Sequence, residues 1–222
     1  MNPEFWLENW KNNKIGFHQQ ITNPYLTLFW KQLDIAAKSL VFVPLCGKSL
    51  DLLWLCQHGH KVLGVEVSDL AASQFFTEND LAYHVFEQEG FYCYQAESLT
   101  FLQGDFFNLT AKHLQDVQGV FDRAALVALP VELRRKYARH LINNLPDTAK
   151  ILLVTFEYDQ AQLNGPPFSV SESEVHALYQ DRYEVKRLFV QDVLESYPQF
   201  QDMGLSGLQE KVYLLQPLPY EK

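Results

Sequence analysis

Apolar residues along this chain form short continuous runs, separated by segments with a helical period. Continuous apolar runs predict strands that are covered on both faces, as in a parallel sheet. Four such runs occupy residues 40–43, 61–67, 119–125 and 151–158. Helices are predicted between them over residues 49–58, 69–79 and 130–144. Alternating strands and helices predict a doubly wound α/β sheet.

The remaining apolar segments predict additions to this sheet. Residues 90–105 alternate more than one parallel strand requires, so we expect a sheet strand there with a small β insertion. After a helix over 172–179, strands are predicted at 183–193 and 208–215. The loop between these strands is too short for a helical crossover, which predicts an antiparallel pair at one edge.

Aromatic residues dominate the segment before the first strand. Phe5, Trp6 and Trp10 fall on one side of a short helix. Asn23 and Pro24 have the N-cap and first-turn chemistry of a second helix. We therefore expect residues 1–35 to be a helical cover over the site of a single domain spanning residues 1–222.

Composition and charge narrow the class of protein. The chain is 47% hydrophobic and 20% charged, which is ordinary for a globular protein. Its net charge of −9 opposes a nucleic-acid surface. A single dense basic run, Arg134, Arg135, Lys136 and Arg139, falls on a predicted helix, where we expect a solvated face. We expect a small-molecule partner and a monomer.

The sequence favours a cytoplasmic protein without metal. No apolar run approaches the roughly 20 residues that cross a bilayer, and residues 1–14 lack the apolar stretch of a signal peptide. Cys46, Cys56 and Cys93 form no Cys-x-x-Cys pair. His58 and His60 lie between a helix and a strand with no nearby ligand set, so we interpret them as a surface turn.

One strand–turn–helix–strand segment predicts a nucleoside site. The first strand leads into a turn at Gly47, and Glu66 ends the second strand nineteen positions later, where ribose hydroxyls are bound in doubly wound sheets. A dinucleotide site needs several glycines for its pyrophosphate, and this turn has one. A phosphate-binding P-loop needs a glycine at position 42, which is Phe42. A nucleoside without a phosphate chain, such as S-adenosylmethionine, is favoured over a nicotinamide cofactor.

Other candidate site residues follow strand ends. Arg123 ends a buried strand at the ligand-binding edge and needs either a bound anion or a carboxylate partner. Asp105 is placed to accept from an adenine amine, with Phe106 stacking on the ring. His18 either lines a substrate pocket or packs in the core. Hydrolase motifs of the Gly-x-Ser-x-Gly and His-Glu-x-x-His types are absent from the sequence.

Several segments together resemble one family. They are FWLENW at 5–10, IGFH at 15–18, NPYL at 23–26, VPLCGKSLDLLWL at 43–55, GHKVLGVEVS at 59–68, FDRAALVALP at 121–130, GPPF at 165–168 and EKVYLL at 210–215. This set resembles bacterial thiopurine S-methyltransferases, which are class I S-adenosylmethionine-dependent methyltransferases. The resemblance implies a seven-stranded, mostly parallel sheet with an antiparallel edge strand, and methyl transfer to the sulfur of a small aromatic or heterocyclic thiol.

The resemblance also implies site residues. Those matching the family's cofactor-contacting positions are Trp10, Leu45, Glu66 and Arg123, with Gly47 in the same turn and Asp105 and Phe106 in the adenine region. From the residues themselves, we expect Phe17, His18 and Trp30 to line the acceptor pocket and Arg123 to stabilise the acceptor anion. Gln199 and Gln201 stand where the family can have a second arginine. Open alternatives are a methyltransferase for halide, simple thiols or inorganic selenium and tellurium species, and a non-catalytic S-adenosylmethionine sensor.

Overall fold

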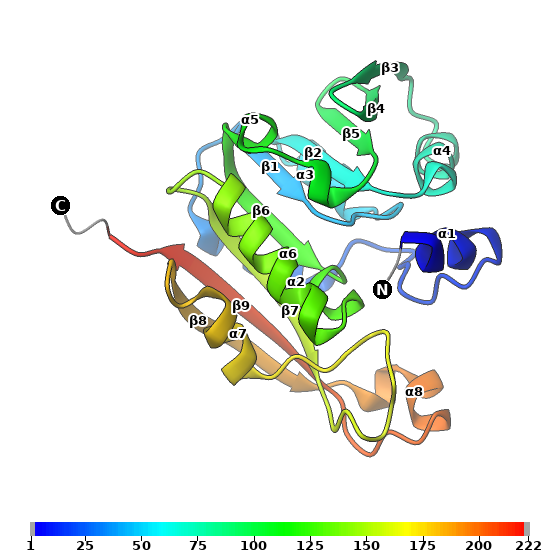
Figure 1. Cartoon of the computed structure of the whole chain (residues 1–222), viewed down its shortest axis with the longest axis vertical. Coiled ribbons are helices and arrows are strands. Elements are labelled where there is room, and N and C mark those ends of the chain that lie inside the picture. Colours follow the sequence, from blue (N-terminus) through cyan, green and yellow to red (C-terminus); the bar gives the residue numbers. More distant parts are fainter. Residues whose placement is uncertain (1–2, 220–222) are drawn as a thin grey trace.

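A computed structural model describes residues 3–219, so both ends of the predicted domain, residues 1–2 and 220–222, lie outside the described residues. The described strands form one nine-stranded sheet in the order β3-β4-β5-β2-β1-β6-β7-β9-β8 (Figure 1). The strands are β1 (Leu40–Val43), β2 (Lys61–Glu66), β3 (His84–Gln88), β4 (Phe91–Gln95), β5 (Leu99–Gln103), β6 (Val117–Arg123), β7 (Lys150–Glu157), β8 (Tyr183–Asp192) and β9 (Gln209–Pro217).

The helices cover both faces of this sheet. They are α1 (Pro3–Lys11), α2 (Pro24–Phe29), α3 (Asp51–Gln57), α4 (Asp69–Glu78), α5 (Ala111–Leu114), α6 (Val131–Asn144), α7 (Glu172–Tyr179) and α8 (Pro198–Asp202). Short 3-10 helices are η1 (Trp30–Leu33), η2 (Phe106–Asn108), η3 (Leu126–Ala128) and η4 (Leu194–Ser196). Among residues 3–219, no helix is long and apolar enough to cross a membrane.

The central strands are parallel and reverse their order beside β1. Strand β1 pairs in parallel with β2 on one side and β6 on the other, β2 pairs with β5, and β6 pairs with β7. The chain thus winds outward in both directions from the β1–β6 boundary. The carboxyl ends at such a reversal form the usual ligand-binding edge of an open α/β sheet. The predicted doubly wound architecture is confirmed.

The sheet has more strands than expected. The antiparallel pair is confirmed, with β9 between β7 and β8, but the total is nine strands rather than seven. The two additional strands are β3 and β4, an antiparallel extension beyond β5. All of β3 is exposed, including Val85 and Phe86. This strand therefore lacks the alternation of buried and exposed residues by which a strand is recognised in sequence. As a result, the predicted insertion begins at residue 90, six residues after the start of β3.

Alternate side chains of the central strands pack into two apolar layers. In β1, Val41 and Val43 face the side of α2, α3 and α4, while Phe42 faces the side of α6 and α7. The N-terminal segment is fixed to the first of these sides through Asp51, whose carboxylate accepts the Asn23 backbone N–H at 2.7 Å. This bond holds the start of α2 against the start of α3.

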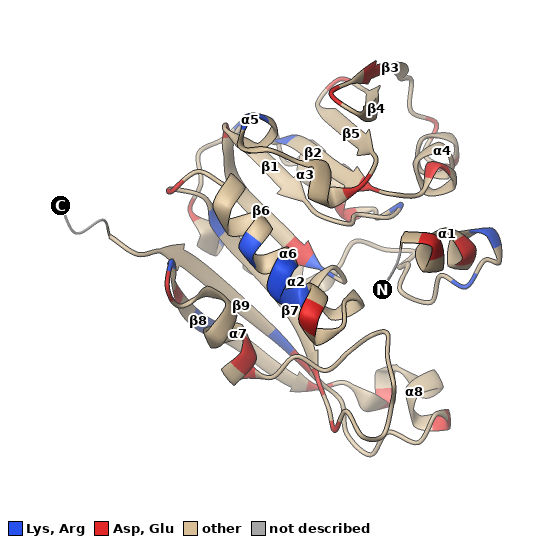
Figure 2. Cartoon of the chain, viewed as in Figure 1, with Lys and Arg blue, Asp and Glu red and all other residues tan. Residues whose placement is uncertain are grey.

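Figure 2 shows the basic residues of α6 in blue. One residue of this run is not solvated, contrary to our expectation. Arg134 is 1% exposed, and its Nε lies 3.0 Å from the Glu174 carboxylate of α7. Its Nη1 donates to the Ser169 carbonyl at 2.9 Å. Arg135, Lys136 and Arg139 are exposed. The sequence could not distinguish Arg134 from these three, because its partner lies on a helix that is distant in the chain.

Candidate active site

The turn after β1 has an unusual backbone. Leu45 has a φ of 45° and Gly47 a φ of 53°, so a bulky residue adopts the left-handed conformation that usually favours glycine. The turn is tied to β2, because the Cys46 N–H donates to the Val65 carbonyl at 2.9 Å. Strained backbone of this kind is concentrated at ligand-binding sites.

Glu66, the last residue of β2, reaches back to this turn. Its Oε2 accepts the Gly47 N–H at 3.0 Å, and its Oε1 accepts the Ser68 N–H at 2.9 Å. The side chain is 6% exposed, and burial raises the pKa of its carboxyl while these hydrogen bonds oppose the rise. A carboxylate has about four acceptor positions, so Glu66 can accept a further hydrogen bond.

Helix α1 of the N-terminal cover lies beside α4, which follows β2 (Figure 1). Trp10 is 4% exposed, and its ring centroid lies 5.6 Å from that of Phe17. A Cβ on Gly47 would lie 3.2 Å from Trp10 Cζ2 and 3.9 Å from Phe17 Cε2. Glycine at position 47 therefore permits both the left-handed backbone and the close approach of Trp10.

Arg123 ends β6, and the chain turns sharply after it at Ala124, whose φ is 60°. The half-buried guanidinium lies close enough to act on the charge of three groups, His18, Tyr197 and Glu210. Burial lowers the pKa of His18, and the positive charges of Lys48 and Arg123 lower it further, against the opposing effect of Glu78. The His18 imidazole is therefore held in its neutral form beside a permanent cation.

The chain that carries this site has relatives that match nearly all of it. The family model described as thiopurine S-methyltransferase matches residues 1–217. A protein of Nitrosospira multiformis named thiopurine S-methyltransferase is 48% identical over 215 residues, covering 97% of this chain and 98% of that protein. The relative of the same name from Pseudomonas fluorescens is 47% identical over 213 residues, covering 96% and 98%.

The chain belongs to the thiopurine S-methyltransferase family. It is an S-adenosylmethionine-dependent S-methyltransferase, so the predicted family, enzyme class and cofactor are confirmed.

Solved structures share the fold of this family member. A Burkholderia thailandensis 1,6-didemethyltoxoflavin-N1-methyltransferase, with bound 1,6-didemethyltoxoflavin and S-adenosylhomocysteine, is similar with a TM-score of 0.65 at 14% identity. The match covers 98% of this chain and 87% of that one. A methyltransferase from Thiobacillus denitrificans in complex with S-adenosylhomocysteine has a TM-score of 0.64 at 15% identity, covering 95% and 98%.

The residues at the turn fit the cofactor of the thiopurine S-methyltransferase family. A buried carboxylate with unused lone pairs suits a pair of ribose hydroxyls. The single glycine of the turn suits a nucleoside that carries no pyrophosphate. When bound, this cofactor supplies a methyl group on a positively charged sulfur, which is already activated for transfer.

Asp105 and Phe106 are arranged differently from the expectation. Asp105 Oδ1 accepts the Phe107 N–H at 2.9 Å and caps η2. The Phe106 ring is 3% exposed and stacks on Tyr137 with centroids 4.7 Å apart. The predicted stacking of this ring on adenine is wrong in this structure, since the ring is buried in the core. A cofactor contact at residue 106 would come from its main chain.

Trp30 lies away from the other predicted residues. Its Nε1 donates to His60 Nε2 at 3.0 Å, and its ring approaches Gly119 near the start of β6. This is the amino-terminal edge of the parallel strands, opposite to Glu66, so the prediction that Trp30 lines the acceptor pocket is wrong. His60 is 8% exposed, which also corrects the expected surface turn. The aromatic pattern could not show which edge of the sheet each ring reaches.

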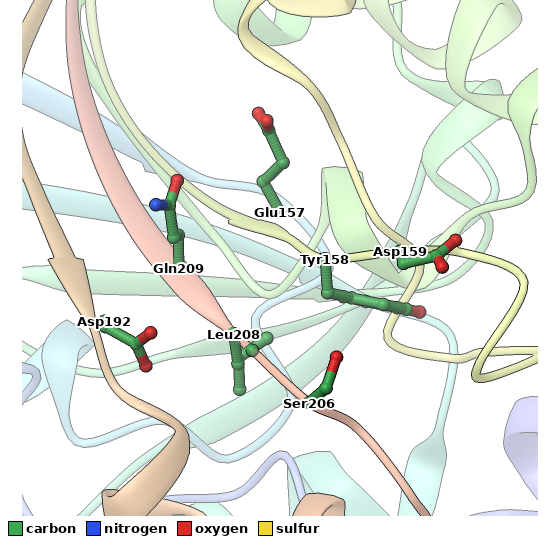
Figure 3. Close-up of a pocket in the computed structure, with 8 residues that line it drawn as sticks. Glu157, Tyr158, Asp159, Asp192, Ser206, Leu208 and Gln209 are labelled. Carbon is green, nitrogen blue, oxygen red and sulfur yellow. The ribbon is translucent and has the colours of Figure 1, made fainter.

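Two further features lie near the acceptor side. Gln199 and Gln201 are exposed on α8. A hollow of about 450 Å³ at the end of β7 and the start of β9 is lined by Glu157, Tyr158, Asp159, Asp192, Ser206, Gly207, Leu208 and Gln209 (Figure 3). None of the predicted site residues lines it. Its three carboxylates make it an unsuitable site for an anionic acceptor.

Sequence analysis missed Glu210 as a candidate. It is 5% exposed on β9 and lies on the acceptor side with Arg123. The only sequence signal was a charged residue opening the apolar run EKVYLL.

Proposed function

We propose that the methyl acceptor is a small aromatic or heterocyclic thiol, bound at the carboxyl edge of β6 beside Arg123. The observation that carries this proposal is the left-handed turn that brings Gly47 onto Glu66 beneath Trp10, one strand away from Arg123. A nucleoside held at Glu66 would direct its reactive end toward the neighbouring strand end.

The donor half of the proposed site consists of one carboxylate, a turn and a cover. Glu66 binds the ribose hydroxyls, and the main chain of Leu45 and Gly47 approaches the nucleoside closely. Trp10 covers the donor and excludes water. Asp105 keeps one carboxylate oxygen that does not cap η2 and can face the adenine amine.

The acceptor half centres on Arg123. Its guanidinium stabilises the negative charge of a thiolate and also neighbours the bound donor. Phe17 and the neutral His18 form the wall on the side of the cover. Because the donor is already activated, these residues chiefly hold the nucleophile in line with the methyl carbon and exclude water. A thiol that is ionised near neutrality needs no separate base.

An Arg123→Ala variant tests this assignment. Losing a charge-assisted hydrogen bond costs about 1.5–3 kcal/mol, so we expect kcat/KM for thiol methylation to fall by about 10- to 150-fold. S-adenosylhomocysteine affinity, measured by calorimetry, should change much less. Arg139→Ala, at an exposed position of α6, is the matched control. A loss of affinity with an unchanged methylation rate would make Arg123 a cofactor residue only.

An acceptor panel with labelled S-adenosylmethionine identifies the class of acceptor. Thiopurines and aromatic thiols should be methylated in preference to simple thiols, halide or selenite. Preferred methylation of an inorganic species would overturn the proposed acceptor. Cofactor binding with no S-adenosylhomocysteine formed from any acceptor would indicate a sensor instead.

We further propose that residues 1–222 act as one monomeric domain in the cytoplasm, with residues 1–35 as its cover. The single sheet through β1 to β9 supports one folding unit. Size-exclusion chromatography with light scattering should give the mass of one chain, and a dimer mass would refute the monomer.

A further inference from the structure

Glu210 is a buried carboxylate that the proposed donor half does not use. It is the second residue of β9, and its side chain is 5% exposed. Burying a charged group is unfavourable unless partners stabilise it. Such a group at the ligand-binding edge of a sheet is a candidate for acid–base chemistry.

Strand register places Glu210 and Arg123 on the same face of the sheet. Arg123 pairs with Val154 of β7, and Glu210 pairs with Phe156 of the same strand. Val154 and Phe156 are two residues apart, so their side chains and those of their partners project in one direction. Phe121 of β6 and Val212 of β9, each two residues from Arg123 or Glu210, belong to the same apolar cluster as Tyr25, which identifies this face as the one covered by α2.

The separation of these two residues suits an aromatic ligand. They are two strands apart laterally and two residues apart along the strand direction, so strand geometry puts their Cα atoms roughly 12 Å apart. The charge of Arg123 acts on the Glu210 carboxyl, so the two side chains approach each other from these Cα positions. The register therefore puts a cation and a carboxylate within the span of one bound aromatic ring, on the same face and at the same edge of the sheet.

Neutral and charged groups around Glu210 keep it ionisable. Burial raises the pKa of its carboxyl, while a hydrogen bond from Tyr25 on α2 and the charge of Arg123 on β6 oppose the rise. Burial and the Glu210 charge together raise the pKa of Tyr197, between η4 and α8, to about 12. Burial and the Glu210 charge also raise the pKa of the Tyr25 hydroxyl, which therefore stays protonated. Glu210 is therefore the basic group of this cluster.

Aromatic rings lie next to this cluster. Tyr25 packs against Phe189 of β8 with centroids 5.7 Å apart. The ring of Tyr197, whose pKa the Glu210 charge raises, meets the Phe156 ring edge-on, with centroids 5.6 Å apart. Apolar walls strengthen charge interactions and favour a flat heterocycle.

We propose that Glu210 is the general base for acceptors that carry their acidic proton on a ring nitrogen beside a thiocarbonyl. This proposal rests on the proposed function. Heterocyclic thioamides exist in water largely as such N–H thiones, which are weaker nucleophiles than the thiolate. The ring N–H of such an acceptor would face the Glu210 carboxylate, and its sulfur would face the Arg123 guanidinium. One bound acceptor would therefore interact with both charged groups.

The step balances in atoms and charge. A sulfur lone pair forms the new S–CH3 bond as the methyl–sulfonium bond of the donor breaks, and its electron pair stays on the departing thioether. The ring N–H proton passes to the Glu210 carboxylate, and the N–H electron pair forms the C=N bond of the aromatic product. One positive and one negative charge are neutralised, and the S-methyl product leaves uncharged.

Two methyl acceptors can show whether Glu210 acts as a general base or only supports the structure. 6-Mercaptopurine presents a ring N–H, whereas 4-nitrothiophenol is already a thiolate at neutral pH and has no N–H to lose. For Glu210→Gln we expect kcat/KM to fall by about 10²–10⁴-fold with 6-mercaptopurine, as for loss of a general base. With 4-nitrothiophenol it should change by less than about threefold, since this thiolate has no proton for a general base to remove. Glu184→Gln, at an exposed position of β8, is the matched control.

Each outcome decides the proposal. Equal losses with both acceptors would make Glu210 a structural residue, and no loss with either would remove it from the reaction. If the unmodified enzyme methylates neither acceptor, the proposed function itself fails, whatever the variant does. Melting temperature and S-adenosylhomocysteine affinity report whether the variant is folded.

Tyr25→Phe provides a second test should the glutamine variant fail to fold. Removing the hydroxyl removes a hydrogen bond that lowers the pKa of Glu210. Because Glu210 must be ionised to accept a proton, the acidic limb of the kcat/KM profile with 6-mercaptopurine should move to higher pH. An acidic limb that stays in place would overturn the proposal, since a purely structural change would lower the rate without shifting the profile.

Discussion

Replacing Glu66 with glutamine tests the donor half most directly. The two carboxylate oxygens accept N–H groups from Gly47 and Ser68 at 3.0 and 2.9 Å. Glutamine keeps one oxygen and replaces the other with an NH2 group, which cannot accept. One of the two backbone N–H groups must then face a donor, and the turn that carries Leu45 and Gly47 loses part of its support.

The expected loss follows from these contacts. A hydrogen bond to a charged group contributes about 1.5–3 kcal/mol, so losing the carboxylate's bonds to the ribose should weaken S-adenosylhomocysteine binding by about 10- to 150-fold. The effect on folding should be smaller, because neutralising a buried group with a raised pKa offsets part of the loss.

Isothermal calorimetry with S-adenosylhomocysteine at pH 7.5 measures this effect. Glu87→Gln is the matched control, because Glu87 is exposed on β3 and far from the turn in the strand order. A glutamine variant at position 66 that stays folded and binds within twofold of the unmodified enzyme would refute our assignment of the ribose site.

Two further predictions concern stability. Burial raises the pKa of Asp122 to about 6 from 3.8, so the folded state binds an extra proton between these pH values and loses stability as pH rises through them. Above pH 6 the ionised form of Asp122 lowers the free energy of unfolding by up to roughly 3 kcal/mol. Asp122→Asn can keep a hydrogen bond to Tyr137 and should therefore raise the urea midpoint at pH 7.5 but not at pH 4. An equal effect at both pH values would contradict this explanation. Gly47→Ala should weaken S-adenosylhomocysteine binding and lower the melting temperature. An alanine in the left-handed conformation costs about 1–2 kcal/mol, and its Cβ would crowd Trp10. If the affinity and the melting temperature are both unchanged, the turn tolerates a side chain.

Local chemistry accounts for the parts of the fold that were predicted correctly. The helix over 172–179 has its predicted bounds, because Ser171 caps its start and an amphipathic period follows. The central strands were evident from their continuous apolar runs. Strand β3 was missed because its side chains are exposed, so no burial pattern distinguishes it from a loop.

Candidate site residues could be placed from the sequence where their position depends only on nearby strand, turn and helix lengths. Glu66 follows its strand and turn at a spacing that strand and helix lengths determine, and the structure brings it onto Gly47. Trp30 and Phe106 are aromatic residues near predicted site elements, yet both pack elsewhere. Their direction depends on neighbours such as His60 and Tyr137, which lie about thirty residues away along the chain.

The sequence by itself determined the order of the central strands and helices and the family, and it predicted the nucleoside half of the site. These depend on apolar periodicity, turn residues and spacing within about twenty positions, all of which are local in the chain. Only the tertiary structure decided that Glu210 lies on the same face as Arg123, eighty-seven residues earlier. That juxtaposition depends on the register of β6, β7 and β9, which is set by long-range pairing and core packing rather than by any local pattern.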